Sequence, residues 1–270
     1  MQASLTELTN HIINQSLLGF QFEATRYAIG TLSVFFVIWI LLAPILRSRR
    51  IRKRQPAGKQ IQLEIFNSMR TIGVFVLLDI IIFDLASNGS LKIYTDISEY
   101  GFIWFGASII LSILLHDTYF YWIHRAMHLP KFYKRFHMTH HRSHNPTPFT
   151  AYSFAIGEAA VEYAYTPILL LMMPMHPSAL AIMLFIMIFK NAIGHCGYEL
   201  FPQGSTRHPI LKHLTTVTHH DMHHEKANGN YGFYFTWWDK WMGTEHVNYE
   251  ARFDAITRST QLKKQKFVTP

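Results

Sequence analysis

The chain has 270 residues, of which 16% are charged, 49% are hydrophobic and 15% are aromatic, with a net charge of +8. Because disordered chains are charge-rich and average soluble domains carry about 25% charged residues, this composition excludes disorder and disfavours an ordinary soluble domain. A single cysteine, Cys196, excludes a disulfide scaffold and a cysteine-rich metal site.

The first apolar stretch, residues 28–46, contains 19 residues without a charge. A helix of that length crosses a hydrocarbon core of roughly 30 Å. Residues 47–54 then carry six Arg and Lys side chains, and a basic run directly after an apolar span marks the cytosolic side. We therefore expect residues 1–27 to form a non-cytosolic segment. We interpret the basic run as a sign of topology and expect no nucleic-acid partner.

Two further apolar stretches cover residues 71–86 and 100–115. The first contains Asp79 and Asp84, which are costly in lipid and are expected to face the interior of the bundle or the far interface. The polar residues 87–99 form the loop between the two stretches. These stretches predict a second span leading away from the cytosol and a third leading back.

A fourth apolar region, residues 163–189, contains no Asp, Glu, Lys or Arg. Pro174 and Pro177 interrupt it, and proline breaks helices. The region predicts a helical hairpin with arms at residues 159–173 and 178–193. Because a hairpin starts and ends on the same side, every histidine-rich segment is placed on the cytosolic side.

These elements predict an all-α fold: an integral membrane bundle of about four transmembrane helices with a cytosolic, histidine-rich, metal-binding cap. The whole chain, residues 1–270, is expected to form one domain, with residues 246–270 as a basic C-terminal tail. The alternative is a soluble all-helical protein. The low charge content and the basic stop after the first span argue against it.

Most of the 17 histidines lie in three short boxes. Because a helix places residues i, i+3 and i+4 on one face, the histidines within each box are expected to converge. The second and third boxes each contain the pattern His-x-x-His-His, at residues 137–141 and 220–224. Two such patterns rarely arise by chance in a chain of this length. The boxes hold His124 and His128; His137, His140 and His141; and His219, His220, His223 and His224.

Neutral imidazole is a ligand for zinc, copper, iron and nickel. The boxed histidines exceed what one ion needs, so they indicate two metal ions. Metal-bound water could hydrolyse a lipid ester, but the histidine boxes provide no obvious general base. Two ions that activate O2 to attack a lipid C–H bond explain both the number of ligands and the membrane location. A metal-dependent lipid hydrolase and a non-enzymatic metal carrier remain alternatives.

The boxes, their order and their surroundings resemble the sterol desaturase / fatty acid hydroxylase superfamily of membrane di-iron oxygenases. The resemblance extends over residues 111–245. It rests on an aromatic lead-in to the first box, on the second box after Phe136, and on an isolated His195 after the hairpin. It also rests on the third box and on the closing segment at residues 228–244.

This resemblance implies an O2-dependent oxidoreductase that hydroxylates or desaturates a membrane lipid, such as a sterol, a sphingolipid or a fatty acyl chain. It implies two iron ions, which zinc can replace in recombinant protein, and no catalytic residues beyond the metal ligands. The implied ligands are His124, His128, His137, His140, His141, His195, His220, His223 and His224.

Four other residues are expected to support these ligands. Some members of the superfamily have a further histidine four residues before the isolated one, where this chain has Asn191. Asn191 is therefore expected to be a weak ligand or a neighbour of the ligands, and His219 is expected in one of the same two roles. Asp221 and Glu158 are expected to accept the free N–H groups of ligand imidazoles.

The chain contains no flavin or nicotinamide motif and no haem-binding domain, so electrons must come from an external carrier of the cytochrome or ferredoxin type. Basic residues at 47–59 and 263–266 could attract an acidic carrier or anionic lipid headgroups. The expected location is the endoplasmic reticulum in a eukaryote or the inner membrane in a bacterium, with the active site facing the cytosol.

Overall fold

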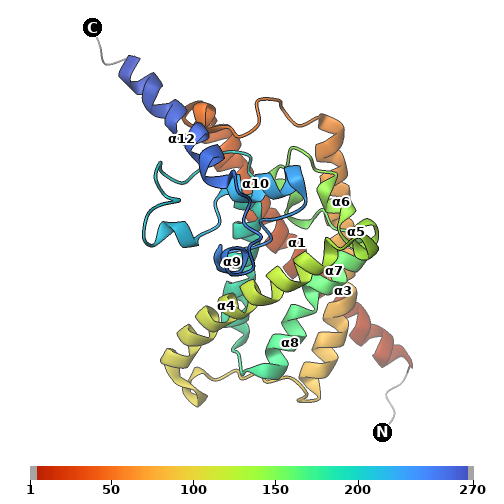
Figure 1. Cartoon of the computed structure of the whole chain (residues 1–270). Coiled ribbons are helices and arrows are strands. Elements are labelled where there is room, and N and C mark those ends of the chain that lie inside the picture. Colours follow the sequence, from red (N-terminus) through yellow and green to blue (C-terminus); the bar gives the residue numbers. More distant parts are fainter. Residues whose placement is uncertain (1–4, 267–270) are drawn as a thin grey trace.

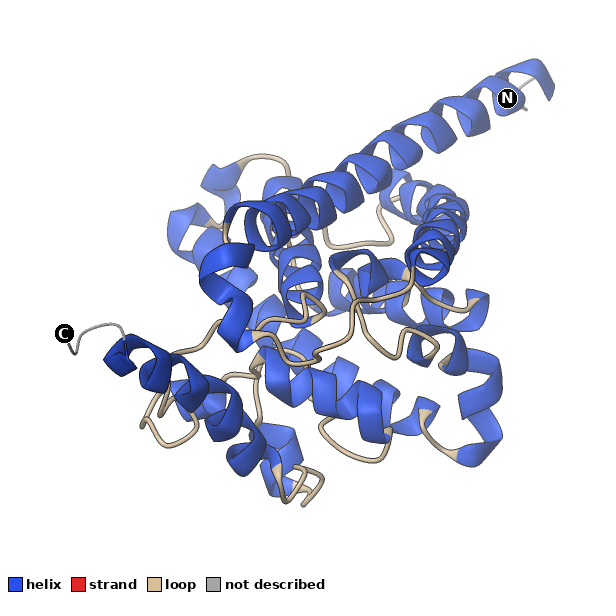
Figure 2. Ribbon diagram, turned by 90° about the horizontal axis from the view of Figure 1, so that it is seen from above, coloured by secondary structure: helices blue, strands red, loops and turns tan. Residues whose placement is uncertain are grey.

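The computed structural model describes residues 5–266, and within this range the chain is helical, with isolated β-bridges as its only extended pairings. Figure 1 shows long helices gathered in a bundle, with short helices at one end, and Figure 2 shows the same arrangement from above. The prediction of an all-α fold is therefore confirmed.

The first long helix begins far earlier than the predicted span. Helix α1 (Leu5–Val34) continues into a π-helical segment (Phe35–Leu41), and Thr9–Leu41 is apolar enough to cross a membrane. The prediction excluded Glu23 and Arg26 because they are charged. In the structure they pair with each other at 2.5 Å and are buried, so the helix continues through them.

Among the described residues, three helices are long and apolar enough to span a membrane: Thr9–Leu41, α4 (Gly101–Met127) and α9 (Pro177–Gly194). Helix α3 (Gly58–Ser87) packs along α1 and contains the predicted second span, residues 71–86. Length and composition alone do not identify α3 as a membrane span. The prediction of a helical membrane bundle is confirmed. The predicted number of about four transmembrane helices is reached only if α3 is also a membrane span.

The first arm of the predicted hairpin is broken into two helices, α7 (Ile156–Tyr163) and α8 (Tyr165–Met172). The prediction of one continuous arm at residues 159–173 was therefore wrong. Pro167 has no N–H group to donate to the carbonyl of Tyr163, so the ladder of helical hydrogen bonds is interrupted there.

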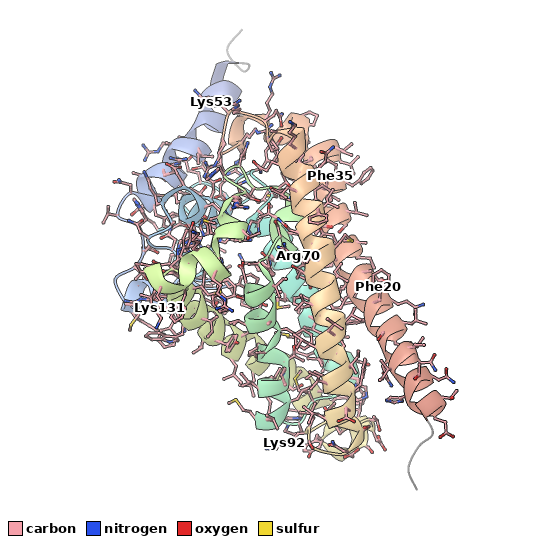
Figure 3. The ribbon with its side chains drawn as sticks, turned by 90° about the vertical axis from the view of Figure 1, so that its right-hand side faces the viewer. Phe20, Phe35, Lys53, Arg70, Lys92 and Lys131 are labelled. Atoms are coloured by element: carbon pink, nitrogen blue, oxygen red, sulfur yellow. The ribbon has the colours of Figure 1, made fainter. Side chains whose placement is uncertain are left out.

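Hydrogen bonds between loops define the two ends of the bundle. At one end, the backbone N–H of Glu199 donates to the carbonyl of Arg49 at 2.9 Å, which joins the basic loop to the segment after α9. At the other end, the N–H of Met175 donates to the carbonyl of Lys92 at 2.9 Å. Figure 3 shows Lys53 and Lys92 at these opposite ends.

The histidine boxes lie at the basic end of the bundle, as the predicted topology requires. They are carried by the end of α4 and by short helices of the cap, one of which is tied to the basic loop by an ion pair between Arg52 and Asp221 at 2.8 Å. The elements of the cap are α2 (Ala43–Leu46), α5 (Pro130–Phe136), α6 (Met138–His141), α10 (Val217–Lys226), α11 (Trp237–Trp241) and α12 (Tyr249–Lys266).

Candidate metal centre

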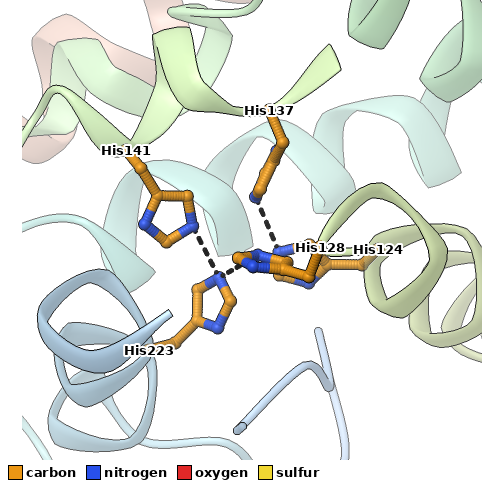
Figure 4. A group of neighbouring side chains, drawn as sticks. All are labelled: His124, His128, His137, His141 and His223. Atoms are coloured by element: carbon orange, nitrogen blue, oxygen red, sulfur yellow. Dashed lines mark hydrogen bonds between the residues drawn. The ribbon is translucent and has the colours of Figure 1, made fainter. Parts of the chain in front are cut away.

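The nine histidines expected to be ligands lie in two groups, and within each group one nitrogen of every ring lies within 4.8 Å of the others. Figure 4 shows the first group, with side chains from α4, the α5–α6 segment and α10 pointing toward one another. We name them the five-histidine group (His124, His128, His137, His141 and His223) and the four-histidine group (His140, His195, His220 and His224).

The histidines within a box do not all converge, which differs from the expectation for boxes two and three. Residues four apart stay together, as His137 and His141 do in the five-histidine group. His140 points instead to the four-histidine group. Adjacent residues on a helix diverge by about 100° because a turn takes 3.6 residues, so neighbouring histidines serve different groups. In the same way, His223 separates from His224 on α10.

Backbone carbonyls fix the protonation state of several rings. The Nδ1 atoms of His124 and His223 lie 2.9 and 2.8 Å from the carbonyl oxygens of Tyr231 and Gly229. A carbonyl oxygen can only accept a hydrogen bond, so each Nδ1 carries the proton and each Nε2 keeps its lone pair. In the four-histidine group, His195 Nδ1 lies 2.8 Å from the backbone carbonyl oxygen of Asn191 at the end of α9.

These lone pairs face one another. The Nε2 atoms of His124 and His137 are 2.9 Å apart, those of His141 and His223 are 2.9 Å apart, and those of His195 and His220 are 2.9 Å apart. Two lone pairs at this distance repel unless a cation lies between them. Nitrogen ligands about 2.1 Å from a metal ion lie about 3 Å apart when they are adjacent in an octahedron. Both groups therefore fit a metal ion.

Burial keeps these imidazoles neutral, the form that binds metal. It lowers the pKa of His128 to about 2 and the pKa values of His195 and His223 to about 4. For His140 and His141, burial lowers the pKa most, and the neighbouring imidazoles lower it further because like charges would repel. At neutral pH, the two groups present uncharged nitrogens.

Glu158 lies where a supporting carboxylate was expected. Its Oε1 atom is 2.6 Å from His137 Nδ1, and its Oε2 atom accepts from the backbone N–H of Ala155. Burial raises the pKa of the Glu158 carboxyl and lowers the pKa of the His137 imidazole. This contact fixes the direction in which His137 presents Nε2.

We predict that Glu158→Gln weakens metal binding by about 10- to 100-fold, the usual cost of removing a carboxylate that orients a ligand histidine. The measurement is the metal retained per chain as a chelator is titrated. Glu64→Gln, which changes a buried carboxylate on α3 that accepts hydrogen bonds from Gln60 and Thr147 rather than from a histidine, is the matched control. Equal retention by the two variants would contradict the orienting role.

The other three expected supporting residues make different contacts. Asp221 binds Arg52 at 2.8 Å and lies on the side of α10 away from His223, so the structure does not bring it to a ligand imidazole. His219 is fully buried, lies outside both groups, and has its Nε2 3.6 Å from a carboxylate oxygen of Asp239. Asn191 offers its backbone carbonyl to a ligand ring, while its side-chain amide donates to a backbone carbonyl at 2.7 Å.

The residues that shape the loop after the third box were not singled out from the sequence. Asp239 accepts from the backbone N–H groups of Tyr231 and Gly232, both at 2.8 Å, which aims the Tyr231 carbonyl at His124. A side chain at Gly232 would come within 2.4 Å of the carbonyl oxygen of Phe235. The sequence Asn-Gly-Asn-Tyr-Gly at residues 228–232 is the feature from which this tight loop could have been predicted.

A largely apolar cavity of about 340 Å³ adjoins the four-histidine group. Four residues line both this cavity and the small space among the histidines: Phe120, Phe154, Glu162 and Asn191. At its other side the cavity reaches Leu18 and Phe83, which are exposed on the apolar surface of the bundle. The cavity therefore joins the histidines to the surface expected to face lipid.

Comparison with known proteins identifies the class. Residues 109–244 match the model of the fatty acid hydroxylase family, so the chain belongs to that family. This confirms the resemblance to the superfamily. Together with the apolar helices, it identifies a membrane protein, and the names of its relatives place it among the oxidoreductases. No solved structure matches the chain.

Several curated relatives act on sterols, as their names state. The chain is 30% identical to a Delta(7)-sterol 5(6)-desaturase of Gibberella zeae, over 77% of this chain and 62% of the relative. It is 31% identical to human lathosterol oxidase, over 78% of this chain and 67% of the relative. It is 34% identical to a methylsterol monooxygenase of Aspergillus fumigatus, over 52% of this chain and 48% of that protein. The match thus covers less than two thirds of the Gibberella protein.

Proposed function

We propose that this protein is an O2-dependent lipid oxidase in which the nine histidines hold two iron ions. The observation that carries the proposal is the convergence of these rings in two groups beside an apolar cavity. Iron held in this way would supply the power to reduce O2 and remove hydrogen from an unactivated C–H bond. The reaction is a hydroxylation or a desaturation.

The residues of the chain have separate tasks in this proposal. The five-histidine group holds one ion and the four-histidine group holds the other. Glu158 and the carbonyls of Tyr231 and Gly229 keep the Nδ1 atoms protonated and so aim the Nε2 lone pairs. The rings of Phe120 and Phe154 separate the histidines from the wider cavity and exclude water from the reacting carbon.

The substrate, partners and orientation follow from the same features. The sterol-oxidising relatives favour a sterol or a related membrane lipid. Electrons come from an external cytochrome- or ferredoxin-type carrier, and the basic residues 47–59 beside the cap offer an acidic carrier a place to approach. The positive end of the bundle faces the cytosol, in the endoplasmic reticulum of a eukaryote or the inner membrane of a bacterium.

The test is the metal content of the full-length protein, purified in detergent from iron-supplemented cells, with the lipids of the same cells analysed in parallel. We expect about two irons per chain and a lipid that is oxidised only when O2 and reductant are present. Replacing both His223 and His224 by Ala removes one ring from each group and should abolish the lipid product.

His144→Ala is the matched control, because His144 is exposed and lies three residues after the second box. It should retain both the iron and the product. Lipid cleavage without O2 by a zinc-loaded protein would favour the hydrolase alternative. Reversible metal release with no lipid product would favour the carrier.

A further inference from the structure

A buried charged pair lies midway along the first membrane span. Glu23 and Arg26 are each about 2% exposed within the helix Thr9–Leu41, and Arg26 Nη2 donates to Glu23 Oε2 at 2.5 Å. Charges at the middle of a bilayer are costly and usually mark function. Neither residue touches the histidine groups, so the metal centre does not explain the pair.

A third charged residue faces the pair from the neighbouring helix. Asp79 on α3 accepts a hydrogen bond from the Tyr163 hydroxyl through Oδ1. Its Oδ2 atom lies against α1 at Gly19, where an added side chain would come within 2.9 Å of it. The absence of a side chain at Gly19 therefore lets this carboxylate approach the helix that carries Arg26.

Several polar atoms of this cluster have no hydrogen-bond partner among the described residues: Arg26 Nε and Nη1, Asp79 Oδ2, and the Tyr152 hydroxyl. All three residues line the cavity beside the four-histidine group. A buried polar atom without a partner costs stability, so such a set, directed at a cavity, indicates a bound polar group.

Aromatic contacts connect this cluster to the metal centre. The Arg26 guanidinium lies 5.6 Å from the ring of Tyr152, which is 6.1 Å from the ring of Phe154, which is 5.4 Å from the ring of His140. The cavity therefore has a polar end at Arg26 and an oxidising end at the four-histidine group. A lipid lying between them would present a carbon several bonds away from its polar group.

The charges of the cluster select the kind of polar group. One guanidinium stands beside two carboxylates, so a carboxylate or phosphate headgroup would meet no net positive charge. Arg26 offers N–H donors and Asp79 Oδ2 offers an acceptor. A hydroxyl group matches both kinds of atom, because it can accept one hydrogen bond and donate another.

We propose that Arg26 and Asp79 form a binding site for the hydroxyl group of a neutral lipid alcohol, and that this site sets which carbon reaches the metal centre. The proposal rests on the proposed function, in which the cavity is the substrate site. His116, also on the cavity wall, has ring nitrogens without a partner among the described residues, but it is less suitable because the rings of Tyr165, Phe233 and Tyr234 pack around it.

The experiment compares the binding of matched lipids to the full-length protein in nanodiscs, without turnover. The probes are cholestanol, cholestanone and cholestane, with hexadecanol, hexadecane and palmitate as a linear series. An alcohol can bind both residues, a ketone can only accept from Arg26, and a hydrocarbon can do neither. We expect each step down the steroid series to weaken binding by about tenfold, and palmitate to bind more weakly than hexadecanol.

Two variants assign the steps to residues. Asp79→Asn keeps the shape and an acceptor for Tyr163 but replaces the free oxygen with a donor, so the preference for the alcohol over the ketone should fall to about one. The double substitution Glu23→Gln with Arg26→Met removes the donors and the balancing charge together. It should abolish the preference for the ketone over the hydrocarbon. His116→Phe should change neither preference.

The outcomes separate this inference from the proposed function. Equal binding of alcohol and hydrocarbon by the wild type in both series would overturn it, as would no saturable binding of either alcohol, or preferences that survive in both variants. Because the wild-type series alone can give the first two results, a misfolded variant does not prevent the test. Selective alcohol binding with no lipid oxidation would refute the proposed function and leave the hydroxyl site standing.

Discussion

Replacing either of two adjacent histidines, His140 or His141, should remove a different metal ion. When His140 is replaced by Ala, the four-histidine group loses a ligand, and when His141 is replaced by Ala, the five-histidine group loses one. We expect each variant to keep about one iron per chain after dialysis against a chelator, and the double variant to keep almost none. Lipid oxidation should fall at least 100-fold in all three, because both ions are needed in the proposed reaction.

The physical reason is that the two rings point in different directions from one short helix. Both are buried, and His140 Nε2 lies 3.2 Å from His195 Nε2, whereas His141 Nε2 lies 2.9 Å from His223 Nε2. Removing one ring leaves the other group with its full set of nitrogens. The measurements are iron per chain by elemental analysis and product per hour from a lipid extract.

The exposed His144 again provides the control, since His144→Ala should leave iron and product unchanged. If the single variants each lost both irons, the two groups would be one cooperative site, and the assignment of one ion to each would be wrong. If His140→Ala and His141→Ala both retained two irons and full activity, the histidines would not be the ligands.

The set of histidines could be read from the sequence, but their division between two groups could not. The spacing shows which residues lie within a turn of each other, yet a histidine three residues away and one four residues away point to opposite sides of their common partner. His223 joins residues from α4 and α6 only because of the way the helices pack. The same packing turns Asp221 toward Arg52.

For the membrane spans, the sequence predicted which segments are apolar but not where the helices begin and break. The apolar stretch after residue 28 was plain, but the charged residues before it appeared to end the span. Glu23 and Arg26 pair with each other, which offsets the energetic cost of burying both charges within the span. No local sequence pattern predicts that Asp79 on α3 faces this pair. The break at Tyr163 was missed because Pro174 and Pro177 are the stronger signal, while Pro167 interrupts the helix with a single lost hydrogen bond.

The position of the cavity explains why a membrane oxidase would place its metals at one end of the bundle. The histidines lie beside the basic loop, where the proposed external electron carrier would reach the cap, and the cavity extends from them between the helices to the apolar surface. In the proposed reaction, lipid and electrons would therefore approach from different directions. A cap with histidines alone would bind metal, but it would not hold a lipid tail away from water.

Acid should destabilise the metal-free protein steeply. Burial lowers the pKa values of His195 and His223 to about 4, below the value of about 6.5 for an exposed histidine. Above pH 6.5 these rings are neutral in both the folded and the unfolded chain, so folding is not opposed by their protonation. Between pH 6.5 and 4 the unfolded chain binds protons that the folded chain does not, so stability falls as the pH falls.

Each such ring costs roughly 1 kcal/mol of stability for every pH unit below 6.5. With two or more rings acting together, the melting temperature of the metal-free protein in detergent should drop by several degrees between pH 7.5 and 5.5. Replacing His195 and His223 together by Gln removes two of the titrating groups and should flatten the dependence on pH. A melting temperature that stays constant over this range in the metal-free wild type would show that the buried rings are not held neutral, and the lone pairs would then not be free to bind metal.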